Sequence, residues 1–106
     1  MAKFLVSVSY SVEGAKGLRK DGGTKREHAA RAAVESLGGK LEAVYFTFGQ
    51  DDAVAIYDLP DNVTAASFSI ASNAAGHVLL SITPLMTVEE MDRAIENSAK
   101  YRVPGG

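Results

Sequence analysis

The stretch LEAVYFTFGQDDAVAIYDL, residues 41–59, decides how this chain folds. Apolar, β-branched and aromatic residues fill both of its ends, 41–48 and 54–59, which is typical of β-strands. The four residues between them, Gly49-Gln50-Asp51-Asp52, are typical of a turn. A short turn between two strands predicts an antiparallel hairpin.

The segments before the hairpin predict a strand and a helix. Residues 3–10 alternate apolar and polar side chains, which predicts a strand. Residues 13–20 contain two glycines, which lower helix propensity, and we expect a loop or one weak helical turn there. Thr24 and Glu27 have the spacing of a capping box, so the predicted helix spans 24–37 and ends at Gly38-Gly39.

The segments after the hairpin predict a helix, a strand and a second helix. Pro60 ends the third strand, and Asp61 is the expected N-cap of a helix that runs to Ala75. Residues 78–83 predict the fourth strand. Thr87 opens another capping box, and the helix behind it is expected to face inward with its apolar residues, Val88, Met91 and Ile95.

This order predicts an α+β fold of the ferredoxin-like type, β-α-β-β-α-β with an additional C-terminal helix. The two longer helices are expected to cover one face of a four-stranded antiparallel sheet. We expect residues 1–106 to form a single domain, with 101–106 as a frayed tail.

The face of the sheet turned away from the helices is the main functional clue. Strand parity predicts Phe4, Val6, Val8, Val44, Phe46, Phe48, Val54, Ile56, Leu80 and Ile82 on the helix side. The other face then carries Leu5, Ser7, Ser9, Ala43, Tyr45, Thr47, Ala53, Ala55, Tyr57, Leu79, Ser81 and Thr83. This mixture is too apolar for water and too polar for a core. We therefore predict that the sheet packs on the sheet of a second copy, with Ser7, Ser9, Tyr45, Thr47, Tyr57, Ser81 and Thr83 lining an interface or a small-molecule cavity.

Composition narrows the classes of function. Eleven basic and thirteen acidic residues give a net charge of −2 over 106 residues, which argues against a nucleic-acid partner. The absence of cysteine excludes disulfides and thiol catalysis and fits a cytoplasmic protein. No apolar stretch approaches the ~20 residues that span a bilayer, so we expect no membrane partner.

Several polar residues could carry chemistry. Lys16, Lys20, Lys25 and Arg26 gather around Asp21-Gly22-Gly23 and could bind an anion, although a solvated basic loop explains them as well. Asp51 and Asp52 could bind a metal or act as an acid–base pair, although aspartates in such turns normally bond their own backbone. His28 could be an acid–base or haem-binding group, but a solvent-exposed histidine on the helix is the simpler interpretation. His77 could border a cavity, but a loop histidine that bonds the backbone is the simpler interpretation. No residue spacing indicates a metal or a cofactor site.

The chain resembles the GYD domain family, small bacterial proteins within the dimeric α+β barrel group. The resemblance covers about Lys3 to Glu90 and rests on ordered motifs: Ser11-Val12-Glu13-Gly14, Arg26, Gly38-Gly39, Gly49 with Asp52, Pro60-Asp61 and Gly76. The sequence departs from the family pattern at Asp51, where the family has a tyrosine. The resemblance implies a ferredoxin-like fold that pairs sheet to sheet as a dimeric α+β barrel, and it supplies no catalytic residue.

Two functions follow from these observations. The first is a self-associating module, a homodimer or larger homo-oligomer, with room for a small organic ligand on the sheet face. The alternative is a cofactor-independent isomerase or monooxygenase that acts on a small carbonyl or aromatic compound. In that case the hydroxyls of Tyr45 and Tyr57 would orient the substrate or stabilise an oxyanion.

Overall fold

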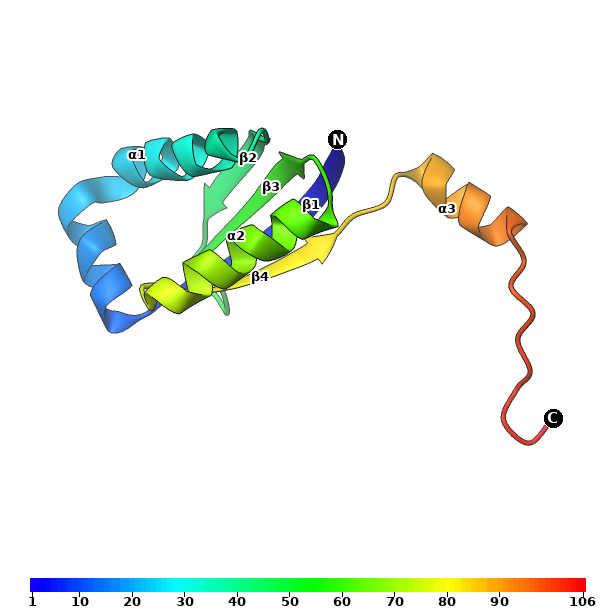
Figure 1. Ribbon diagram of the computed structural model, residues 1–106. Helices are drawn as coiled ribbons and strands as arrows, with labels where there is room; N and C mark the ends of the chain where they lie inside the picture. The colour runs from blue at the N-terminus through cyan, green and yellow to red at the C-terminus, as the bar shows by residue number, and fades with distance from the viewer.

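The computed structural model describes residues 1–106 and shows the predicted order of elements (Figure 1). Strands β1 (Ala2–Tyr10), β2 (Lys40–Phe46), β3 (Ala53–Leu59) and β4 (Val78–Pro84) form one antiparallel sheet in the order β2-β3-β1-β4. Helices α1 (Val12–Ser36) and α2 (Asn62–Ala75) connect the strands, and α3 (Val88–Glu96) follows β4. The ferredoxin-like α+β fold is therefore confirmed.

The predicted hairpin of β2 and β3 is fixed to β1 by its turn. The Thr47 amide donates to the Asp52 carbonyl oxygen at 2.8 Å, which closes the turn. The Asp52 carboxylate accepts the Tyr10 amide at 2.8 Å, and the Asp52 amide donates to the Val8 carbonyl oxygen at 2.8 Å. Strand β2 ends at Phe46, two residues earlier than predicted, and the turn begins there. Phe48, expected under the helices, is fully exposed.

The caps of α2 and α3 are confirmed. The Asp61 carboxylate accepts the Thr64 amide at 2.8 Å, and Gly76 ends α2 in the left-handed region with φ 81°. Thr87 and Glu90 make both bonds of a capping box at the start of α3.

Helix α1 begins twelve residues earlier than predicted, so residues 13–20 form continuous helix in place of the expected loop or single weak turn. Ser11 caps it by accepting the Gly14 amide at 3.2 Å, and Glu13 in the first turn suits the helix dipole. Gly14 is needed because a Cβ there would lie 1.9 Å from the His77 carbonyl oxygen. A kink at Gly22, with φ 82° and ψ 168°, divides α1 into two segments (Figure 1). Thr24 lies within α1, two residues after the kink, and the capping box predicted for Thr24 and Glu27 does not form.

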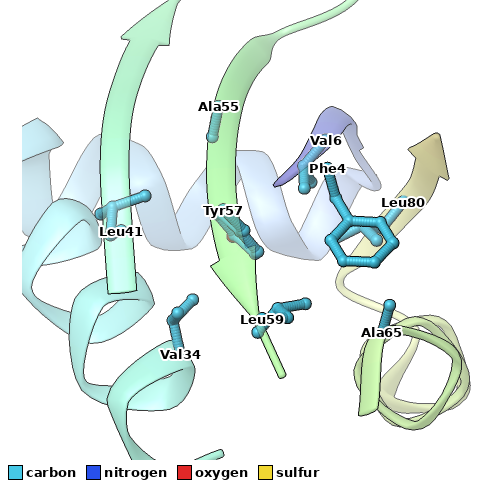
Figure 2. Packing of buried hydrophobic residues seen from close by; sticks show 9 residues of the cluster. All are labelled: Phe4, Val6, Val34, Leu41, Ala55, Tyr57, Leu59, Ala65 and Leu80. Carbon is cyan, nitrogen blue, oxygen red and sulfur yellow. The ribbon is translucent and has the colours of Figure 1, made fainter. Parts of the chain in front are cut away.

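The hydrophobic core lies between one end of the sheet and the two helices (Figure 2). Phe4 and Val6 of β1, Leu59 of β3 and Val34 of α1 are fully buried, and Ala65 joins them from α2. Because residues from both helices belong to this cluster, α1 and α2 cover the same face of the sheet. No helix of this chain covers the second face of the sheet.

The predicted side of β3 is wrong. Tyr57 is 4% exposed and packs edge-to-face on Phe68 of α2, with ring centroids 5.4 Å apart. The register explains this inversion, because Tyr57 lies opposite Phe4, and Phe4 is a core residue. The helix side of β3 therefore carries Ala53, Ala55, Tyr57 and Leu59, and the open face carries Val54 and Ile56. Apolar residues occupy both sides of this strand, so hydrophobicity alone could not choose between them.

Helix α3 projects away from the sheet (Figure 1), so its predicted inward face is also wrong. Val88, Met91 and Ile95 are 81%, 49% and 67% exposed, and no residue of α3 is buried. The radius of gyration is 16.8 Å, well above the ~13 Å of a compact chain of this length. The amphipathic helix α3 and the chain that follows it both extend away from the sheet (Figure 1), which contributes to the difference.

Candidate functional site

The open face of the sheet is the first surface that can support a function. We use this name for the outward side chains of the four strands. Tyr45 and Leu79 are 70% and 73% exposed, and Leu5, Val54 and Ile56 lie half-buried between them on neighbouring strands. Small hydroxyl residues complete the surface. Ser7 pairs with Ser81, and Leu5 pairs with Thr83.

An ion-pair cluster borders the open face at the start of β1. The Lys3 ammonium lies 2.7 Å from the Glu42 carboxylate and 3.0 Å from the Asp58 carboxylate. Hydrogen bonds to Glu42 and Asp58 raise the pKa of Lys3. The open face thus has an uncharged centre and a charged cluster at one border.

The predicted site residues separate into three places. Ser7, Ser9, Tyr45, Ser81 and Thr83 share the open face as expected. Thr47 lies in the hairpin turn, where its hydroxyl bonds the Asp51 carbonyl oxygen. Tyr57 lies on the opposite side of the sheet. Tyr45 and Tyr57 therefore lie on opposite faces of the sheet. The hypothesis of an enzyme at the open face had placed both on that face.

A cavity of about 210 Å³ lies on the helix side, at the end of the sheet away from the densest packing. It is lined mainly by apolar residues: Val8, Ala29, Ala30, Ala33, Val44, Phe46, Ala53, Ala55, Phe68, Val78 and Leu80. Its polar lining consists of Tyr10, Arg26, Glu27, Tyr57 and Ser72. Burial, and to a lesser extent Tyr10, raises the pKa of Tyr57 to about 12, while Arg26 opposes this shift. The Tyr57 hydroxyl is therefore neutral at physiological pH.

Sequence reasoning missed this cavity because it looked for large apolar residues. The signal was present in the alanines. Ala53 and Ala55 occupy core-facing strand positions where Val or Ile is usual. Ala30 and Ala33 line the same cavity from α1. Small side chains on two facing elements leave space between them.

The four basic residues predicted to bind an anion do not share one environment. Lys16, Lys20 and Lys25 are exposed, whereas Arg26 is partly buried and lines the cavity. Lys16 lies 3.8 Å from Glu13 within its own helix. The kink at Gly22 separates the helical segment of Lys16 and Lys20 from that of Arg26.

The carboxylates of the hairpin have a structural use, since Asp52 accepts the Tyr10 amide and so holds the turn on β1. His28 and His77 are exposed, and the His77 carbonyl oxygen accepts the Ser11 amide at 3.0 Å. No three His, Asp or Glu side chains of the chain come together as a metal site would require. None of the helices has the length and apolarity needed to cross a membrane.

Asn73 is a further residue that the sequence did not single out. Its amide nitrogen donates to the Leu80 carbonyl oxygen at 3.0 Å, and its amide oxygen accepts the Leu80 amide at 2.7 Å. Both bonds go to β4, which is an edge strand. Asn73 thus satisfies backbone groups on that edge and joins α2 to the sheet.

The fold and these surfaces define a ferredoxin-like α+β domain with one covered and one uncovered sheet face. A family model for the GYD domain matches residues 4–95, and the chain belongs to that family. The comparisons found no match among curated proteins and none among solved structures.

Proposed function

We propose that this chain is a self-associating module in which two copies pack their open faces together about a two-fold axis. The observation that carries the proposal is the exposure of Tyr45 and Leu79, 70% and 73%, beside Leu5, Val54 and Ile56. A sheet face of this composition is stabilised by a second apolar layer. A second copy supplies an identical layer, which a two-fold axis makes self-complementary.

The charge distribution supports a second copy as the occupant of the open face. The charges at its border are one ammonium, Lys3, and two carboxylates, Glu42 and Asp58, which leave a net charge of only −1. They therefore add little repulsion when the same border of another copy approaches. The centre of the face carries no charge at all, which matches the depletion of charged residues in interface cores.

Helix α3 gives the assembly a second contact. It carries four acidic residues and one arginine beside its exposed apolar face. The surface from Val12 to Lys25 on α1 carries four basic residues and two acidic ones. We infer that α3 of one copy packs on α1 of its partner, because opposite charges favour that docking and α3 has no burial within its own chain.

Light scattering after size exclusion tests the association. We expect a mass of at least twice the 11.2 kDa of one chain at micromolar concentration. A chain that stays monomeric up to roughly 100 µM, which is about the range of weak but specific association, would contradict the proposal. The docking of α3 has its own test, since Ile95→Ser should weaken association by removing apolar contact, and high salt should weaken it further by screening the charges. A cytoplasmic location stays a prediction from the composition.

A further inference from the structure

The cavity beneath α1 lies in the same layer as the hydrophobic core. Val8, Ala53 and Ala55 form its floor on β1 and β3, and α1 contributes three alanines above them. The core is dense at the other end of the same layer, around the fully buried Phe4 and Leu59. The hydrophobic layer is thus filled at one end and hollow at the other.

One buried polar atom at this cavity has no partner. The Nε of Arg26 is shielded from solvent and makes no hydrogen bond. Burying such a donor without an acceptor costs free energy, so the Arg26 side chain is left with one unsatisfied N–H group beside the cavity. The neighbouring carboxylate does not meet this need, because Glu27 lies 4.0 Å from Arg31 and forms its ion pair there.

Two tyrosines lie in the same polar corner as Arg26. Tyr10 and Tyr57 both line the cavity, and both Tyr10 and Arg26 influence the ionisation of Tyr57. Phenolic hydroxyls can donate hydrogen bonds to an anion, and a guanidinium presents its N–H groups in a planar fork that matches a carboxylate. This corner therefore combines a permanent positive charge with neutral donors, next to an apolar chamber.

We propose that the cavity binds a small apolar monocarboxylate, with the carboxylate on Arg26 and the hydrocarbon part among the alanines. An apolar cavity of about 150 Å³ accommodates one benzene ring, so about 210 Å³ accommodates a ring or a short branched chain together with its carboxylate. This ligand class goes beyond the proposed self-association. Ligand binding does not depend on self-association, because the cavity and the open face lie on opposite sides of the sheet.

The first experiment is calorimetric titration of the full chain with benzoate, cyclohexanecarboxylate and hexanoate, with benzamide as the neutral counterpart of benzoate. We expect at least one acid to bind and benzamide to bind roughly 10- to 100-fold more weakly than benzoate, since it lacks the charge-assisted bond to Arg26. Binding of none of the three acids at millimolar concentration overturns the proposal. Equal binding of benzoate and benzamide does so as well.

Variants then locate the site. Arg26→Gln should weaken binding of the acid by the same 10- to 100-fold, whereas Arg19→Gln, at an exposed arginine of the same helix, should leave it unchanged. Ala30→Leu fills the cavity and should abolish binding of acid and amide alike. Unchanged acid binding in Arg26→Gln or in Ala30→Leu overturns the assignment.

A readout on the wild-type chain keeps the test decisive if Arg26→Gln does not fold. The methyl groups of Ala53 and Ala55 face the cavity and report occupancy by nuclear magnetic resonance. We expect benzoate to shift these signals, while the methyl of the exposed Ala99 stays unchanged. Saturable binding that leaves Ala53 and Ala55 unshifted overturns the proposal.

Discussion

Leu79→Glu should break the association of two copies through the open face. Leu79 is 73% exposed within one chain, on strand β4. Complete burial of a leucine side chain is worth about 1.5–3 kcal/mol, so covering the exposed part contributes roughly 1–2 kcal/mol. A two-fold axis places the residue in the interface twice, which makes the loss about 2–4 kcal/mol. The dissociation constant should then rise roughly 30- to 700-fold.

The glutamate makes these figures a lower bound, because its carboxylate must also leave water in the assembly. Ile70→Glu is the matched control. Ile70 is 70% exposed, close to the value of Leu79, but it belongs to α2 on the other side of the sheet. Sedimentation velocity over a dilution series measures the dissociation constant of each variant. Equal association of Leu79→Glu and the wild type, or equal weakening by Ile70→Glu, would refute the role of the open face.

Three further predictions concern stability, measured by denaturant unfolding at one fixed chain concentration. Asn73→Ala should cost about 1–3 kcal/mol, because it removes both bonds to Leu80 and leaves backbone groups of β4 unpaired; a loss below a few tenths of a kcal/mol contradicts this. Gly39→Ala should cost about 1–3 kcal/mol, since its Cβ would lie 2.5 Å from the Asp58 carbonyl oxygen; a neutral or stabilising effect contradicts the close approach. The hydrogen bond from the Thr64 amide lowers the pKa of Asp61 below 3.8, so this carboxylate stabilises the fold above that pH and the contribution disappears as the pH falls further. Asp61→Asn, which still caps the helix, should reduce the loss of stability in acid, and an unchanged pH profile counts against this assignment.

Local signals in the sequence predicted local structure well. The caps at Asp61 and Thr87 satisfy backbone amides three residues away or at the cap itself, and the bond from Thr47 to Asp52 closes the turn, whereas the capping box predicted at Thr24 did not form. Such bonds need no tertiary partner to be recognised. The order of elements followed from these signals, and the ferredoxin-like fold followed from the order.

Properties that depend on distant partners could not be predicted in the same way. The side of β3 was decided by its register with β1, and that register lies in no single segment. The first half of α1 forms despite two glycines, because Ser11 caps it and Gly14 permits close contact with His77. The inward face expected for α3 assumed a partner within the chain, and the chain provides none.

The candidate site divides along the same line. Five of the seven residues predicted for the sheet face do lie on it, because strand parity was right for β1, β2 and β4. Tyr57 lines the cavity because its strand presents the other side to the helices. Arg26 also lines the cavity, and the kink at Gly22 separates it from Lys16 and Lys20. The cavity could not be predicted because it depends on the alanines of α1 lying opposite those of β3, and only the tertiary structure shows this.

Cross-linking through a single introduced cysteine tests the face-to-face assembly most directly. The chain contains no cysteine, so Ser7→Cys provides one thiol in the middle of the open face, on the central strand β1. A bifunctional maleimide with a spacer near the ~10 Å separation of packed sheets can bridge two copies there. We expect Ser7→Cys to form covalent dimers in high yield and Ser67→Cys, on the exposed side of α2, to remain monomeric under the same treatment. Monomeric Ser7→Cys, or equal cross-linking of both variants, would contradict the pairing of open faces.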